Sequence, residues 1–305
     1  MRRVVIGKND QDQRLDRFIE KYLPKASYHW IQKMIRIKKI KRNKKRAKAE
    51  DILKEGDVLS FYIYEEDLQV LEEKIPRVTS KIPLHFVYEN EDFAVLNKPR
   101  SLLCHPASKK DYGQTLIDAF VDHLIQKKEY IPHLEKSFRP SLVNRLDFHT
   151  QGLVLAAKNH KALFSLNQAM KERKIEKYYR AFVKGKIDQK LVIDKALYRE
   201  DQKIIISDKG KASRTIVKPL DYNEKFSYLD IKLETGRFHQ IRAHLASIGH
   251  PLIGDGQFGE RSRSYFSLLS YKLVFLDIPN FPFWKNMEFL SPSLKEFEND
   301  VRRHL

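Results

Sequence analysis

The sequence has a single cysteine, Cys104, among its 305 residues. One cysteine cannot form an internal disulfide, and it cannot supply a zinc or iron–sulfur site that needs several thiolates. The sequence thus excludes the disulfide-rich and multi-cysteine metal classes. We interpret Cys104 as a semi-buried loop thiol and not as a nucleophile.

Long apolar runs are also missing. No stretch approaches the roughly 20 residues that a membrane-spanning helix needs. The amino terminus, MRRVVIGKND, has only a short run from Val4 to Gly7, whereas a signal peptide needs about 7 to 15 apolar residues. We find no internal repeat or low-complexity tract. These absences predict a cytoplasmic protein that has no membrane partner.

Acidic residues are scarce relative to basic ones. The chain has 40 Asp and Glu against 58 Lys and Arg, which gives a formal net charge of +18 and a pI near 9.7. Such a charge favours a polyanionic partner, with nucleic acid ahead of an anionic membrane surface. The length and the 42% hydrophobic content suit one large domain and one small domain with real cores.

The positive charge is concentrated at the start of the chain. Residues 1–65 contain 18 Lys and Arg against 9 Asp and Glu, which is half of the total excess in about a fifth of the chain. Apolar residues at helical spacing predict one helix near Leu15 to Leu23, and Ser27 can cap a second helix. Val58 to Tyr64 alternates like a strand. We therefore predict a small basic domain at residues 1–70.

The segment from Lys21 to Lys48 contains no acidic residue. A charge run is usually a solvated face, but these residues fall on a compact helix–helix–turn–strand unit, which would hold them on one surface. The segment from Gln13 to Tyr64 also resembles the S-four-like RNA-binding domain. That resemblance implies contacts with the RNA backbone from Lys38, Lys39, Lys41, Arg42, Lys44, Lys45 and Arg46.

A charged stretch leads into a second domain of different character. We place the linker at residues 71–81 and the larger domain at residues 82–305. Helical spacing is found at Thr115 to Gln126 and at Ala162 to Lys171. Strands are predicted at Phe86 to Val95, Leu153 to Ala157, Tyr178 to Val183 and Leu229 to Leu233. This mixture predicts an α+β fold built on a mixed, largely antiparallel central sheet with flanking helices.

Three segments of the larger domain carry polar residues that suit a site. In NRLDFHTQGLVLAAKN, Asp147 lies two residues after Arg145 in a polar turn ahead of a buried strand. A lone Asp in a turn is by default a backbone cap. In EKYYRAFVKG, Tyr179 could be an ordinary half-buried strand residue or a stacking platform for a base. In TGRFHQIRAHLASIG, Arg242 lies at the edge of an apolar helix face and could reach a buried carboxylate or solvent.

A fourth segment, Gly254 to Gly259, matches G-x-G-x-x-G, which in nucleotide-binding units cradles a pyrophosphate. No strand of useful length precedes it, and no apolar helix stripe follows it. We therefore interpret it as a turn-rich loop and not as a dinucleotide or methyl-donor site.

The three segments, in this order, resemble the three sequence motifs of the RluA family of RNA pseudouridine synthases, and the resemblance covers nearly the whole chain. It implies the pseudouridine synthase fold, with Asp147 as the catalytic residue, Tyr179 packed against the target base and Arg242 paired with Asp147. Arg145 is similar to the residue that fills the space left by the flipped nucleotide. This chain has Asn144, Gln151 and Ser101 where most members have histidine, serine and glycine.

The chemistry agrees with these roles. Isomerising uridine requires the base to leave the stack, detach from the ribose, rotate and reattach through carbon 5, with no redox step or group donor. Flipping costs a few kcal/mol, which stacking and pocket contacts can recover. An ionised carboxylate can act as the nucleophile, and a close guanidinium favours that charged form. Attack on the sugar, attack on the base and abstraction of a sugar proton remain open alternatives.

We therefore predict an RNA pseudouridine synthase that needs no cofactor and no metal. We expect it to be a monomer that acts on ribosomal RNA, favouring the large subunit, with transfer RNA as a second possibility. The alternative from another class is a non-catalytic RNA-binding or ribosome-assembly factor on the same fold, which the positive charge supports equally well.

Overall fold

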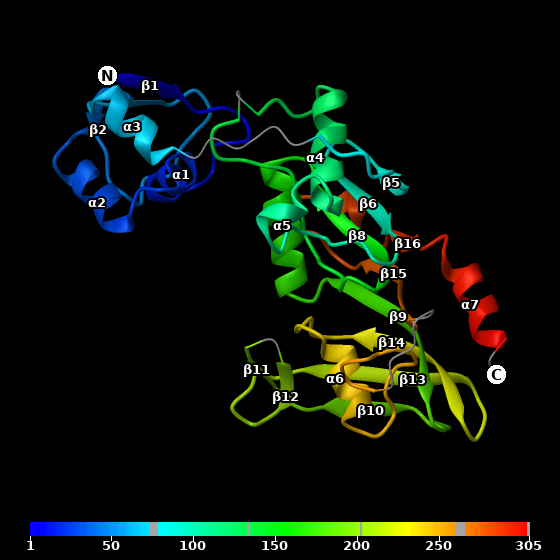
Figure 1. Cartoon of the computed structure of the whole chain (residues 1–305). Helices are drawn as coiled ribbons and strands as arrows, with labels where there is room; N and C mark the ends of the chain where they lie inside the picture. The colour runs from blue at the N-terminus through cyan, green and yellow to red at the C-terminus, as the bar shows by residue number, and fades with distance from the viewer. Residues whose placement is uncertain (73–78, 133–134, 202, 260–265, 304–305) are drawn as a thin grey trace. The chain divides into compact units, whose positions relative to one another are not determined.

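The computed structural model describes residues 1–72, 79–132, 135–201, 203–259 and 266–303 (Figure 1). Contacts between residues divide the chain into two compact units. The first comprises Met1–Thr79, Phe120–Ser141 and Lys158–Lys161, and the second comprises Ser80–Ala119, Leu142–Ala157 and Ala162–Leu305. In the described residues, no helix combines the length and the apolarity that crossing a bilayer requires.

The first unit is built on a sheet with the strand order β1-β4-β2-β3. Leu15, Phe18 and Ile19 are fully buried at one face of α1, and the Ser27 side chain caps α2 by accepting a hydrogen bond of 3.2 Å from the Trp30 amide. The elements are β1 (Arg2–Val5), α1 (Leu15–Tyr22), α2 (Tyr28–Arg36), β2 (Ile40–Arg42), β3 (Lys45–Arg46), β4 (Val58–Phe61) and α3 (Glu65–Leu71). The first strand, the strands β2 and β3, and α3 were not predicted from the sequence.

The basic run ends in a β-hairpin. Strands β2 and β3 pair with Lys41 opposite Arg46 and Arg42 opposite Lys45. Asn43 and Lys44 form the turn with φ angles of 49° and 63°, the left-handed conformation that a two-residue hairpin loop of type I′ requires. The hairpin therefore presents Lys44, Lys45 and Arg46 at its exposed tip.

The second unit is built on a larger sheet with the strand order β10-β13-β14-β9-β15-β8-β6-β5, and β16 lies beside β15. The pair of β15 and β8 is parallel, whereas the other neighbours in this order are antiparallel. The strands are β5 (Phe86–Glu89), β6 (Phe93–Lys98), β8 (Gln151–Ala157), β9 (Ile175–Lys184), β10 (Leu191–Asp194), β13 (Arg214–Tyr222), β14 (Phe226–Leu233), β15 (Leu268–Phe275) and β16 (Glu288–Leu290). The predicted α+β fold with a mostly antiparallel sheet is confirmed.

Helices flank this sheet. Ala162, Leu166 and Ala169 of α5 belong to a buried cluster with residues of β6, β8 and β15, and Phe297 and Val301 of α7 belong to a second cluster. The flanking helices are α5 (His160–Lys171), α6 (Gln240–Ala246) and α7 (Leu294–Arg302), whereas α4 (Leu116–Gln126) is divided between the two units. Short 3₁₀ turns occur at η1 (Lys109–Asp111) and η2 (Pro282–Trp284). A separate hairpin consists of β11 (Leu197–Glu200) and β12 (Lys203–Ile206).

The domain boundaries drawn from the sequence stay a prediction. Most of the proposed linker at 71–81 falls on residues 73–78, which lie outside the described residues. The contacts also group residues 120–141 with the amino-terminal unit. Within that unit the Asp10 carboxylate accepts hydrogen bonds from the Ser137 amide at 2.8 Å and from the Ser137 hydroxyl at 2.7 Å.

Candidate active site

Asp147 lies in the loop that connects the two-residue strand β7 (Ser141–Leu142) to β8. The Thr150 amide donates to the Asp147 carbonyl at 3.1 Å, which closes the predicted turn. At Gly152 the chain enters β8 with φ 114°, and an added Cβ would lie 2.1 Å from the Ser270 carbonyl oxygen. Glycine is thus required here for both its backbone angle and its lack of a side chain. This glycine lets the start of β8 pair closely with β15 at Ser270.

Two side chains anchor the part of this loop that precedes Asp147. The Asn144 amide oxygen accepts from the Leu155 amide at 2.7 Å, which ties the loop to β8. The Cys104 sulfur accepts from the Leu146 amide at 3.3 Å, and burial raises the pKa of this thiol. Cys104 is more buried than predicted, with 5% of its surface exposed, and its hydrogen bond fits a structural thiol. Asn144, one of the departures from the family pattern, thus bonds to the backbone of β8.

Lys98 supports the part of the loop that follows Asp147, and this role was not identified from the sequence. It is fully buried, and its ammonium donates to the carbonyls of Pro99, Leu102 and Phe148 at 2.9, 2.8 and 3.1 Å. Burial lowers the pKa of Lys98 to about 8, and the charges of Cys104 and Asp147 oppose this shift. Lys98 therefore fixes the backbone immediately after Asp147.

The 99–102 turn held by Lys98 contains another departure from the family pattern. Ser101 adopts φ 56°, in the left-handed region where glycine carries no steric penalty and other residues do. This conformation fits the glycine that the family resemblance led us to expect at the position. In this chain the turn is formed with serine, and three hydrogen bonds from one buried lysine stabilise the loops on both sides.

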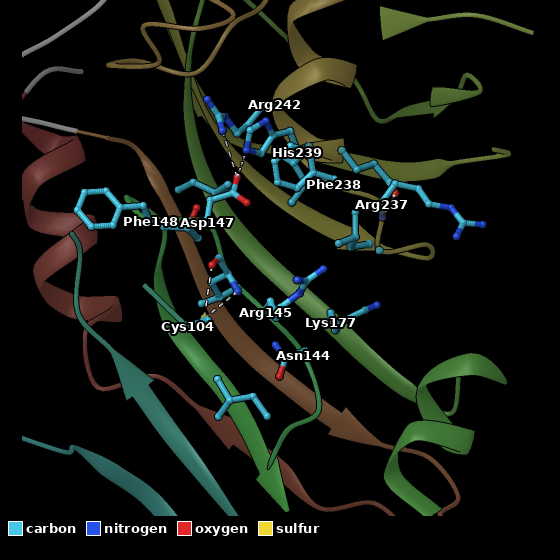
Figure 2. Close-up of a pocket in the computed structure, with 18 of the residues that line it drawn as sticks. Cys104, Asn144, Arg145, Asp147, Phe148, Lys177, Arg237, Phe238, His239 and Arg242 are labelled. Atoms are coloured by element: carbon cyan, nitrogen blue, oxygen red, sulfur yellow. Dashed lines mark hydrogen bonds and ion pairs between the residues drawn. The ribbon is translucent and has the colours of Figure 1, made fainter. Parts of the chain in front are cut away.

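A cavity of about 720 Å³ opens beside Asp147 (Figure 2), a volume within the range of ligand pockets. It is lined by the Asp147 loop, by the segment 103–107, by β9 residues and by the start of α6. Asp147, Arg145, Tyr179 and Arg242, predicted from three separate motifs, all line it. The structure therefore brings the four residues to one place.

Arg242 connects Asp147 to a second, buried carboxylate. Its Nη1 donates to Asp147 Oδ2 at 3.3 Å, while Nε and Nη2 donate to Asp255 at 2.7 and 2.8 Å. The Asp255 side chain is completely buried, and that of Arg242 is 10% exposed. Burial raises the pKa of Asp255, but the hydrogen bonds and charge of Arg242 outweigh it and the net pKa is lowered. This bidentate pair fixes the guanidinium that faces Asp147.

Asp255 belongs to the G-x-G-x-x-G segment that we interpreted as a turn-rich loop. The structure shows turns from Ile253 to Phe258 and neither a preceding strand nor a following helix among the described residues. The Asp255 carboxylate also accepts from the amides of Gln257 at 3.0 Å and Phe258 at 3.3 Å. The loop has a specific task, which is to carry the carboxylate that orients Arg242, and sequence spacing gave no signal of it.

His239 is a further pocket residue that the sequence reasoning missed. Its Nε2 lies 3.6 Å from Asp147 Oδ2, and its ring stacks on Phe238 with centroids 3.7 Å apart. Burial lowers the pKa of His239, although Asp147 raises it. The residue precedes α6 in a left-handed conformation with φ 52°, and this bend turns the ring toward Asp147 (Figure 2).

Asp147 remains accessible despite these contacts. Its side chain is 25% exposed, and the Arg242 and His239 contacts both involve Oδ2. No described residue is bonded to Oδ1. One carboxylate oxygen is therefore held in place while the other can meet a substrate.

Tyr179 projects from β9 and is 6% exposed. Burial raises the pKa of its hydroxyl, and the Asp147 charge adds to the effect, so the ring is a neutral aromatic surface in the cavity. Arg145, in contrast, is exposed at the cavity rim. Among the described residues, no group of His, Cys, Asp and Glu side chains comes together in a way that could hold a metal ion.

The predicted RNA-binding residues lie on the first unit, and they differ in exposure and in whether their side chains contact other residues. Lys38, Lys39, Lys44, Lys45 and Arg46 are exposed. Arg42 instead forms an ion pair of 2.7 Å with the buried Asp57, and the Lys41 ammonium lies 4.9 Å from the centre of the Tyr62 ring. Arg42 thus has a structural partner.

Comparisons with known proteins identify the family and agree with the fold. A family model described as RNA pseudouridylate synthase matches residues 92–247. An uncharacterized RNA pseudouridine synthase of Aquifex aeolicus is 35% identical over 262 residues, which cover 83% of this chain and 79% of that protein. Ribosomal large subunit pseudouridine synthase D of Yersinia pestis is 31% identical over 262 residues, which cover 85% and 76%.

Solved structures show the same fold. Human RNA pseudouridylate synthase domain containing 1 has a TM-score of 0.51 and 23% identity, and covers 76% of this chain and 98% of that chain. Human RNA pseudouridylate synthase domain containing 4 has a TM-score of 0.55 and 17% identity, and covers 72% and 92%.

The family model and the relatives therefore identify an RNA-modifying isomerase. The chain belongs to the RNA pseudouridylate synthase family, as the three motifs predicted. Its activity is the isomerisation of uridine to pseudouridine in RNA.

Proposed function

We propose that this enzyme modifies specific uridines of ribosomal RNA, in the large subunit, and that Asp147 is its catalytic residue. The observation that carries the assignment is the Asp147 carboxylate, which lines the cavity with Oδ2 held by Arg242 and Oδ1 free of partners among the described residues. The choice of RNA is supported by the relative from Yersinia pestis, which is named for the ribosomal large subunit.

The roles of the surrounding residues follow from what each side chain can do. Uridine must lose its bond between N1 and C1′ and gain one between C5 and C1′, while a proton leaves C5 and one is added at N1. No redox partner is needed. Arg242 stabilises the ionised form of Asp147. The neutral Tyr179 ring offers a surface for the detached base to stack against, and Arg145 at the rim can fill the space that the flipped nucleotide leaves.

The amino-terminal unit is proposed to be an S-four-like RNA-binding domain. Its helices, hairpin and exposed basic tip give a fixed surface of positive charge, and such a surface suits the backbone of folded RNA. Contacts of this kind position the substrate and do not read its sequence. Transfer RNA is the substrate that would replace ribosomal RNA if the modified uridine proved to lie there.

Mapping of pseudouridines in total RNA tests the proposed substrate. RNA from cells with the gene, from cells without it, and from cells that carry Asp147→Asn would be compared position by position. We expect a pseudouridine in large-subunit ribosomal RNA that is lost in the last two strains. A site restricted to transfer RNA would refute the substrate.

The same variant tests the catalytic assignment in vitro. Asp147→Asn keeps the size of the side chain but removes its charge, so we expect no pseudouridine formation and RNA binding close to that of the wild type. Normal isomerisation by the variant would refute Asp147 as the catalytic residue.

A further inference from the structure

The cavity contains more positive charge than its known task explains. Among the residues that the structure describes, the lining includes four cationic side chains, Arg145, Lys177, Arg237 and Arg242, and one carboxylate, Asp147. Arg242 is paired with Asp147 and Asp255. The other three make no side-chain hydrogen bond or ion pair with any described residue. Uracil is neutral, so these charges have no counterpart in the base itself.

Lys177 is the most enclosed of the three. It is half-buried, whereas Arg145 and Arg237 are exposed. Burial lowers the pKa of the Lys177 ammonium, and the charge of Arg173 adds to this effect. Holding a cation in such a place without an acceptor is costly. The cost is offset when a ligand supplies the missing negative charge.

Two lysines of this unit differ sharply in how they are satisfied. Lys98 is fully buried, and three backbone carbonyls accept from its ammonium at 2.8 to 3.1 Å. Lys177 lines the open cavity, and no described carbonyl or carboxylate accepts from it. A structural lysine would resemble Lys98. Lys177 has instead the surroundings of a binding group.

The chain also leaves room for this ammonium. A Cβ added at Gly236 would lie 3.2 Å from Lys177 Nζ, and the Gly236 backbone is not in the left-handed region that would itself require glycine. A side chain at position 236 would therefore crowd the ammonium. Gly236 lines the same cavity, so the smallest residue stands where the ammonium meets the open space.

We propose that Lys177 binds a backbone phosphate next to the target uridine. This inference rests on the proposed stacking of the base against Tyr179. Lys177 and Tyr179 are two residues apart on β9 and point to the same face of the sheet. The distance along the strand is about 7 Å, which one nucleotide can bridge from its base to its phosphate. Arg145, Lys177 and Arg237 lie along one side of the pocket (Figure 2), and a bent RNA backbone could follow them.

Single-turnover kinetics on a short synthetic RNA would test the proposal, with a uridine that the wild type modifies as the target. Lys177→Met should lower kcat/KM about tenfold to a hundredfold, the range for losing a charge-assisted hydrogen bond. Lys218→Met is the matched control, because Lys218 is exposed on β13 and does not line the cavity. The control should leave kcat/KM unchanged.

Neutral methylphosphonate linkages identify the contact itself. A single such linkage 5′ or 3′ of the target uridine should lower the wild-type kcat/KM by the same factor at one of the two positions. The same substrate should cause no further loss in Lys177→Met. The proposal would be overturned if, at both positions, the methylphosphonate lowered the kcat/KM of Lys177→Met by as large a factor as it lowers that of the wild type. It would also be overturned if Lys177→Met were as active as the control.

A second variant guards against a folding defect. Gly236→Ala keeps Lys177 but crowds its ammonium, so it should reduce kcat/KM and weaken the sensitivity to the methylphosphonate. Thermal denaturation reports whether each variant folds. If Lys177→Met is unfolded and Gly236→Ala responds like the wild type, the proposal is wrong. These results are separable from the catalytic assignment, which fails only if Asp147→Asn remains active.

Discussion

Replacing Asp255 with asparagine should disturb the active site although Asp255 does not line the cavity. Asp255 is the fully buried partner that accepts from Arg242 at 2.7 and 2.8 Å. Removing one partner of a buried pair costs about 3–5 kcal/mol. Arg242 would keep its contact with Asp147 at 3.3 Å, so we expect the lower end of that range, about 3 kcal/mol, in urea denaturation at pH 7.

The loss should also reach the reaction rate. The asparagine side chain would direct its amide hydrogens or a single neutral oxygen at the guanidinium, and Arg242 would no longer be fixed by two charge-assisted hydrogen bonds. A misplacement of about 1 Å at a catalytic group can cost about a hundredfold in rate. We expect kcat to fall by at least about tenfold, while RNA affinity changes little.

The pH dependence gives an independent check. The net pKa of Asp255 is lowered in the folded state, so its contribution to stability is present above the ordinary value of about 3.9 and is lost as the pH falls through the lowered value. The stability difference between wild type and Asp255→Asn should therefore be constant near neutral pH and shrink below about pH 4.

Gln257→Ala is the matched control for this prediction. Gln257 accepts at 3.1 Å from Arg242 Nη2, which also donates to Asp255. Unlike Asp255, Gln257 is neutral and exposed. Its loss should cost about 1 kcal/mol or less and have a small effect on rate. The reasoning is refuted if Asp255→Asn matches this control at pH 7, or if its stability deficit grows as the pH falls.

Two further predictions concern other parts of the chain. Glutamine substitutions at Lys44, Lys45 and Arg46 of the hairpin tip should weaken RNA binding. They should also reduce the slope of log K against log[salt] by about 0.7 to 0.9 for each lost phosphate contact. An unchanged slope would show that these residues are a solvated face. Gly152→Ala should destabilise the protein by well over about 2 kcal/mol in urea denaturation, because its Cβ would lie 2.1 Å from a backbone oxygen. Gly249→Ala, with a similarly positive φ of 82° but open space, should cost only about 1–2 kcal/mol, and equal losses would refute the steric argument.

The family resemblance of three ordered motifs singled out the residues that the structure places in one cavity. Asp147, Tyr179 and Arg242 fall in three motifs, and their order in the chain indicated the family. The predicted helices and strands that frame them coincide with α4, α5, β8, β9 and β14 to within a few residues. Apolar periodicity reports these elements directly, since each buries one face.

The sequence could not indicate residues whose task depends on distant partners. Asp255 meets Arg242 across 13 residues of chain, and Lys98 reaches a carbonyl 50 residues away. His239 lies 3.6 Å from Asp147, and its backbone adopts φ 52°. None of these contacts leaves a periodic or compositional pattern in the sequence. They emerge from the fold, where loops of different origin meet beside the central strands of the sheet.

The position of β15 determines when the active site can exist. Strand β8 follows the Asp147 loop and β9 carries Tyr179, yet these consecutive strands do not pair with each other, because β15 lies between them. During synthesis, the chain must therefore reach Phe275, the end of β15, before the two halves of the pocket can be brought together. Such long-range pairing slows folding. A nascent chain that already contains every residue of the three motifs should still be unable to modify RNA.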